Sequence, residues 1–176
     1  MKKLITPLLI FILANAGFAQ IKSTITRSAI TFTIKNVGIS TGGSIGGLVA
    51  AVQFNPANLP ASNIEASVDV NTLNTDNSSR DDHLKSEDFF DVTHYPKITL
   101  KSVSFKHKNG NNFSGQFSLA IKNKSKLVEV PFSYVENNGS ATLKGSFKLN
   151  RLDYGVGTDS FTLSDDVTVN IDVEVK

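Results

Sequence analysis

The chain has 176 residues, enough for one domain with a substantial hydrophobic core, and its 18 Lys and Arg against 16 Asp and Glu give a formal charge of +2. Two of the Lys lie in an N-terminal segment that we expect to be removed, so the remaining chain is formally neutral and nucleic acid is not an expected partner. The sequence has no Cys, which excludes disulfides, thiol catalysis and thiolate metal ligands.

The first residues have the pattern of a secretory signal peptide. Residues 1–3 carry two Lys, residues 4–13 are mostly apolar, and Gly17 and Ala19 place small side chains three and one residues before a cleavage point. We therefore predict a signal peptide over residues 1–19 and a mature domain over residues 20–176. The protein is expected to be periplasmic or secreted. The apolar run is too short to span a bilayer, so no stable membrane span is expected after cleavage.

Beyond residue 20 the sequence mostly alternates apolar and polar residues, which is typical of half-buried β-strands. The alternation slips in phase between Leu100 and Val103, which predicts a β-bulge. The Gly-rich run at residues 42–47 is interpreted as a turn or bulge between two strands. An additional strand near residues 21–26 is left open. Eight strands are predicted, at residues 30–34, 48–54, 64–70, 97–107, 113–121, 128–134, 141–149 and 167–175.

One stretch, SRDDHLKSEDFFD, does not follow the strand pattern. It predicts a short helix near residues 79–90, which Ser78 or Ser79 can cap and whose acidic first turn complements the helix dipole. Such a helix could cover one end of a barrel, with Phe89 and Phe90 pointing inward.

The hairpin turns and the Phe residues narrow the architecture. Short turns such as Asn109-Gly110 imply antiparallel neighbours, and either a sandwich or a closed barrel of about eight strands fits an all-β chain. In a closed barrel the strand Phe residues would line one apolar volume suited to an alkyl or isoprenoid chain, and an ordinary packed core is the alternative. These residues are Phe32, Phe54, Phe105, Phe113, Phe117, Phe132 and Phe147.

The sequence offers little for catalysis or metal binding. His83 and Glu87 have the spacing of two metal ligands on a helix, but His94 and His107 lie at no recognisable ligand spacing, so we predict no metal and no cofactor. No nucleophile elbow, phosphate loop or dinucleotide fingerprint occurs. An enzyme is therefore not expected. The alternative is a hydrolase or isomerase acting on a lipid-like ligand, with His83 and an Asp as acid and base.

Several short motifs occur in order along the chain. They are Asn55-Pro56, Val68-Asp69-Val70, Asn74-Thr75, Arg80-Asp81 with His83-Leu84, Asp88-Phe89-Phe90-Asp91, Tyr95-Pro96, Lys101-Ser102, Arg151-x-Asp153-Tyr154-Gly155, and the terminal run that begins at Asp166. Together they resemble the signature of the YceI-like family, and the resemblance covers residues 21–176.

The resemblance implies an exported, lipocalin-like, eight-stranded antiparallel barrel whose elongated apolar pore holds a polyisoprenoid or another amphiphilic lipid. It implies no enzymatic activity, because none is established for the family as a class. This chain departs from the family pattern at three positions. Asn36 stands where the family usually has His, Leu48 where it has an aromatic residue, and Asn123 where it has Gly. The first of these departures leaves open a different ligand.

We therefore expect a lipid-binding protein with an isoprenoid or fatty amphiphile as its partner, the apolar tail inside the barrel and the polar head near one mouth. Arg80 and Asp81 are expected to anchor the helix to the barrel, with a head-group contact as the alternative. A homodimer is left open, and so is a stress-related or structural module whose barrel is packed solid. The predicted ligand-binding residues are Phe32, Phe54, Val68, Arg80, His83, Phe89, Phe90, Phe117, Phe132 and Phe147.

Overall fold

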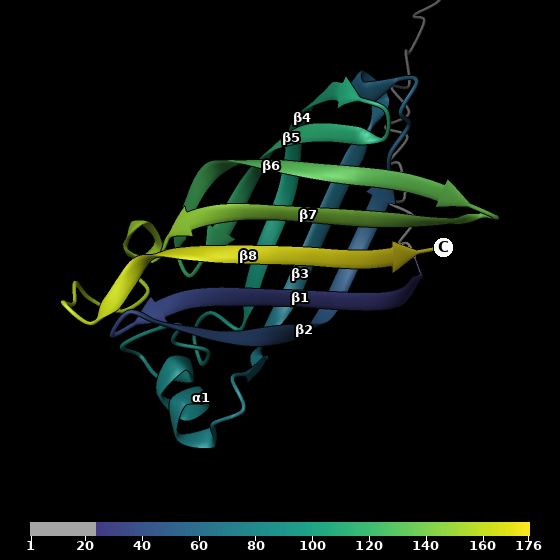
Figure 1. Cartoon of the computed structure of the whole chain (residues 1–176). Coiled ribbons are helices and arrows are strands. Elements are labelled where there is room, and N and C mark those ends of the chain that lie inside the picture. The colour runs from purple at the N-terminus through teal and green to yellow at the C-terminus, as the bar shows by residue number, and fades with distance from the viewer. Residues whose placement is uncertain (1–23) are drawn as a thin grey trace, which may run out of the picture.

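The computed structural model describes residues 24–176, which form a closed barrel of eight antiparallel strands (Figure 1). Each strand pairs with the next along the chain, and β8 pairs back with β1. The predicted lipocalin-like barrel is therefore confirmed, and the sandwich is rejected. The predicted signal peptide lies outside the described residues. The strands are β1 (Ile25–Asn36), β2 (Ile39–Gln53), β3 (Asn63–Asn74), β4 (Lys97–Asn109), β5 (Asn112–Ile121), β6 (Lys124–Asn137), β7 (Ser140–Asn150) and β8 (Leu163–Val175).

The sequence predicted two irregularities, one in β4 and one at the Gly-rich run of residues 42–47. The bulge in β4 is confirmed, because the pairing of β4 with β5 shifts between Ser102 and Ser104. The Gly-rich run lies inside β2, so its interpretation as a turn between two strands is wrong. The alternative of a bulge agrees with the structure, because the pairing of β2 with β3 shifts between Ser44 and Gly46 and again between Gly46 and Val49. A Cβ on Gly43 would lie 2.6 Å from Cζ of Phe32 and 2.7 Å from the carbonyl oxygen of Asn74. Glycine is present here because neighbouring groups approach the backbone closely.

At one end of the barrel, aromatic side chains fill the interior. The ring of Phe54 lies 4.7–5.4 Å from the rings of Phe105, Phe113, Phe132 and Tyr134, mostly edge to face. Phe117 joins them through Phe105, at 5.7 Å between ring centroids. We call this end the closed end. The aromatic cluster that fills it consists of Phe54, Phe105, Phe113, Phe117, Phe132 and Tyr134.

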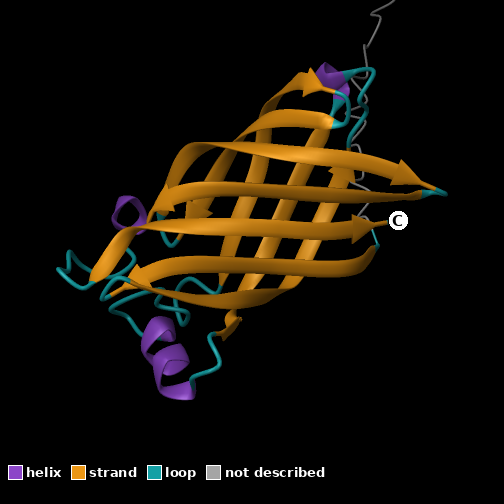
Figure 2. Ribbon diagram, in the orientation of Figure 1, coloured by secondary structure: helices purple, strands orange, loops and turns teal. Residues whose placement is uncertain are grey.

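The opposite end, which we call the open end, carries the helix α1 (Ser78–Lys85) and the short 3-10 helix η2 (Arg151–Tyr154). Figure 2 shows these helices, and a third short one, η1 (Leu59–Ala61), beyond the ends of the strands. None of the helices between residues 24 and 176 has the length and apolar character needed to cross a bilayer.

The predicted helix over residues 79–90 is shorter than expected. Asn77, and not Ser78 or Ser79, caps it, because the Asn77 side-chain oxygen accepts a hydrogen bond from the amide of Arg80 at 2.9 Å. The helix ends at Lys85, where the hydroxyl of Ser86 donates to the carbonyl of His83 at 2.7 Å. Residues 86–96 continue as turns without a strand.

Candidate ligand-binding cavity

A cavity of about 850 Å³ occupies the open half of the barrel, within the range of small-molecule sites in proteins. Its walls come from all the strands except β6, at their ends nearest α1, together with residues of the segments 80–90 and 156–163 at the mouth. The apolar wall includes Ile30, Phe32, Ile34, Val68, Leu119, Ile121, Phe147, Leu149, Val167 and Val169.

The pairing of strands explains why several predicted wall residues meet. Phe32 of β1 and Phe147 of β7 are both paired with Val169 of β8, so the three residues lie at one height in adjacent strands. Val68 reaches the same cavity from β3. Phe32, Val68 and Phe147 therefore line the cavity, together with Phe89 and Phe90 from the segment that follows α1.

Three other predicted ligand-binding residues lie elsewhere. Phe54, Phe117 and Phe132 are buried in the aromatic cluster at the closed end and do not line the cavity. The single enclosed volume expected from the Phe residues is thus divided into a filled half and an open half. Alternation along a strand assigns a residue to the inner face, but it does not say at which height of the barrel the side chain lies.

α1 is attached to the barrel through Thr75, at the end of β3. The carboxylate of Asp81 accepts hydrogen bonds from the amide of Thr75 at 2.9 Å and from its hydroxyl at 2.5 Å. The Arg80 guanidinium donates to the same hydroxyl at 2.8 Å and to the Thr75 carbonyl at 2.5 Å. These bonds hold Arg80 beside the cavity and provide the helix-to-barrel anchor expected from the sequence.

Arg80 is half-buried and lines the cavity mouth. Within residues 24–176 no carboxylate forms an ion pair with it, whereas Arg151, the other Arg of the cavity, pairs with Asp165. The exposed Asp88 and Asp159 also lie at the mouth. The apolar wall thus ends in a polar rim where Arg80 forms no direct ion pair in the described chain, and the Asp81 carboxylate reaches it only through the shared Thr75 hydroxyl.

His83 also lines the mouth, but its side chain is largely exposed. Its ring packs nearly perpendicular to that of Phe89, at 4.9 Å between centroids. Its Nε2 lies 4.0 Å from the nearer Asp88 carboxylate oxygen, which is beyond hydrogen-bond distance. Across the described residues, no three His, Asp or Glu side chains converge as a metal site would require. The geometry places His83 as a wall residue.

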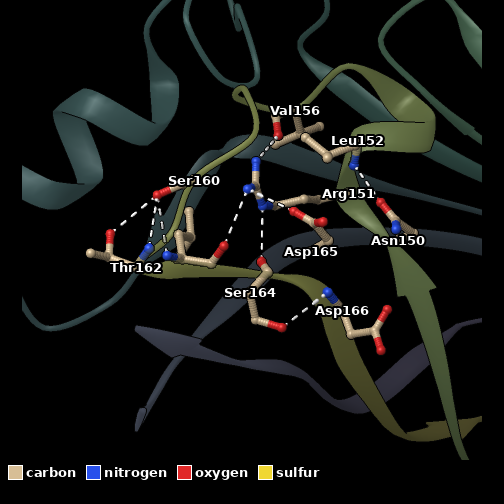
Figure 3. A network of polar contacts seen from close by, with 10 residues as sticks. Asn150, Arg151, Leu152, Val156, Ser160, Thr162, Ser164, Asp165 and Asp166 are labelled. Atoms are coloured by element: carbon tan, nitrogen blue, oxygen red, sulfur yellow. Dashed lines mark hydrogen bonds and ion pairs between the residues drawn. The ribbon is translucent and has the colours of Figure 1, made fainter. Parts of the chain in front are cut away.

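Arg151 is a cavity residue to which the sequence analysis gave no role. It is only 4 % exposed, and it donates to the carbonyls of Val156, Leu163 and Ser164 and to the carboxylate of Asp165 (Figure 3). These bonds shape the loop at residues 155–162. The motif Arg151-x-Asp153-Tyr154-Gly155 was the available signal, but a motif alone does not show which backbone carbonyls an Arg will reach.

The loop at residues 155–162 also closes against the segment after α1. The amide of Gly157 donates to the carbonyl of Asp88 at 3.1 Å. A Cβ on Gly157, whose φ is +69°, would lie 2.8 Å from the Phe89 ring and 2.9 Å from Nη1 of Arg151. Gly157 thus allows both cavity-lining segments to meet at one side of the mouth.

Residues 22–175 match the family model of the YceI-like domain. The chain belongs to the YceI-like family. Among curated relatives, a UPF0312 protein of Vibrio cholerae serotype O1 is 24% identical over 150 residues, covering 81% of this chain and 79% of the relative. A UPF0312 protein of Pectobacterium carotovorum is 27% identical over 152 residues, covering 82% and 79%.

Solved structures agree with the barrel of this YceI-like protein. The crystal structure of Burkholderia cenocepacia BcnA has a TM-score of 0.81 at 25% identity and covers 85% of this chain and 96% of its own. A polyisoprenoid binding domain from Saccharophagus degradans, implicated in plant cell wall breakdown, has a TM-score of 0.71 at 12% identity, covering 88% and 97%. At that identity the second likeness concerns the fold alone.

Proposed function

We propose that this YceI-like protein is an exported carrier that holds one long-chain amphiphile, such as a polyisoprenoid or a fatty derivative, in the open half of its barrel. The observation that carries the proposal is the cavity of about 850 Å³, which has an apolar wall and a polar mouth. Further support comes from the Saccharophagus degradans protein of the same fold, which is described as a polyisoprenoid binding domain.

The cavity suggests an orientation for the ligand. The apolar chain lies along Phe32, Val68 and Phe147 and stops at the aromatic cluster, where no space remains for it. The polar head lies at the mouth near Arg80, whose guanidinium is held by Thr75 without a carboxylate partner in the described chain. A head group that accepts hydrogen bonds fits this position best.

Export is supported by the signal-peptide pattern of residues 1–19, and it leads to a periplasmic or secreted carrier. Catalysis by His83 is not part of the proposal, because His83 is exposed and lacks a hydrogen-bonded carboxylate. A His83→Ala variant is accordingly expected to keep its lipid affinity within about twofold, since an exposed wall residue contributes little burial.

Native mass spectrometry of the purified protein tests the function directly. We expect a complex heavier than the polypeptide by one amphiphile, which is released on denaturation and replaced when a long-chain isoprenoid alcohol or fatty acid is added. A protein that repeatedly carries no lipid, and takes none up from either probe, would contradict the proposal.

A further inference from the structure

Three apolar side chains protrude from the open end. Val37, in the turn between β1 and β2, and Ile39, the first residue of β2, are each 70% exposed, and Phe161, in the loop before β8, is fully exposed. The amide of Val37 donates to the carbonyl of Thr162 at 2.7 Å, so the turn and the loop lie side by side (Figure 1). We call Val37, Ile39 and Phe161 the rim patch.

The rim patch borders the cavity mouth. Asn36 precedes Val37 and lines the cavity, and Ser160 and Thr162 flank Phe161 and line it as well. Along both segments, residues that face the cavity therefore adjoin exposed apolar residues. A molecule that enters or leaves beside this edge passes the rim patch.

Val37 has a backbone conformation that is unfavourable for its side chain. Its φ is +51° and that of Gly38 is +75°, and this left-handed region is unfavourable for a β-branched side chain. The hairpin turn between β6 and β7 has the same backbone conformation but uses Asn138, with a φ of +48°, before Gly139. Asn-Gly is the usual pair in such a turn. Strain of this kind is found at functional positions. At Val37 the property that would justify the strain is an exposed apolar side chain.

The size and charge of the rim patch favour one kind of partner. Three side chains present far less than the ~800 Å² that each partner buries in a stable protein interface. Asp159 is the single charged residue in the two segments, residues 36–40 and 155–162. A small, protruding and almost uncharged patch is suited to shallow insertion into the surface of a bilayer.

We propose that the rim patch docks the open end of the barrel on a lipid bilayer, so that the amphiphile passes between bilayer and cavity beside Val37 and Phe161. The inference rests on the proposed function, because only a lipid cargo requires such a path. Its observations, however, are independent of the cavity itself: the exposure of the three side chains, the hydrogen bond that joins their segments, and the strain at Val37.

Flotation with phosphatidylcholine vesicles tests the docking. We expect the purified protein to float with the vesicles, and Phe161→Ser to lower the partition coefficient about tenfold, since one exposed aromatic side chain loses its apolar contact. Val37→Asn should also lower it, while raising the melting temperature by about 2–4 °C because Asn tolerates the left-handed turn. Val135→Asn is the matched control, an exposed Val on β6 outside the rim patch. It should float as the parent does.

The outcomes separate the docking from the function. If the parent does not float, or if Phe161→Ser and Val37→Asn float equally well, the docking is overturned. If these variants instead change the apparent mass in size-exclusion chromatography while flotation is unchanged, the patch contacts protein and the docking is again overturned. Uptake of a long-chain isoprenoid alcohol from detergent is measured in parallel. Normal uptake without flotation removes only the docking, whereas failure of all uptake removes the proposed function.

Discussion

The two ends of the barrel use the same residue types for opposite purposes. At the closed end, Phe54 lies among four aromatic rings, and the interior is filled. At the open end, Phe32 and Phe147 face a cavity of about 850 Å³. Inward-facing Phe residues therefore have no fixed role in this fold. Their height in the barrel decides whether they fill the interior or line the cavity.

The ends also differ in how they are closed. The closed end depends on apolar packing, whereas the open end is held by hydrogen bonds from Arg80 and Arg151 to backbone carbonyls and side chains. These hydrogen bonds fix the segments that border the mouth, and they do so without filling the cavity. We infer that the closed end supplies stability, and the proposed binding site is at the open end.

The strongest way to break this comparison is a pair of truncations. Phe54→Ala should lower the free energy of unfolding by about 3–5 kcal/mol, because it leaves a hole in a packed cluster. Phe32→Ala should lower it by only about 1 kcal/mol, since its side chain already borders empty space, yet it should weaken lipid binding more. Urea denaturation and lipid titration measure the two effects. Equal destabilisation by both substitutions would show that the ends do not differ as described.

A second prediction concerns the polar anchor at the open end. Arg151→Lys keeps the charge but loses most of the hydrogen bonds to Val156, Leu163 and Ser164, so we expect a destabilisation of about 1–3 kcal/mol. Limited proteolysis should then cut within residues 155–162 more readily than in the parent. Unchanged stability and unchanged cleavage would show that Arg151 does not hold the loop.

The smallest effect is expected from pH. The hydrogen bond to the Asp91 carboxylate, together with its charge, raises the pKa of His94 in the segment after α1. Because the folded pKa lies above the unfolded one, the stabilisation is fully present below about pH 6.5 and is lost as the pH rises through the folded pKa. His94→Gln should remove this part of the pH dependence of unfolding. A stability difference between parent and variant that is constant from pH 5 to 8 would contradict the assignment.

Much of the fold follows from the sequence, and specific residues show why the rest does not. Alternation located the eight strands, and the phase slip near Val103 located the bulge in β4, because both depend only on local periodicity. The assignment of Phe54, Phe117 and Phe132 to the cavity wall was wrong, because the height of a residue in the barrel depends on strand register. Alternation along one strand does not give that register. The loop contacts of Arg151 depend on residues 156–165, whose path has no periodic signal.

The most direct test of the central claim is to fill the open half of the barrel and measure lipid uptake by native mass spectrometry. Val169→Phe places a ring between Phe32 and Phe147, inside the cavity. Thr168→Phe, the matched control, adds the same ring to the adjacent residue of β8, which by alternation faces outward. We predict that most of the Val169→Phe protein is free of lipid, whereas Thr168→Phe carries lipid as the parent does. Equal loading of both variants would contradict the account.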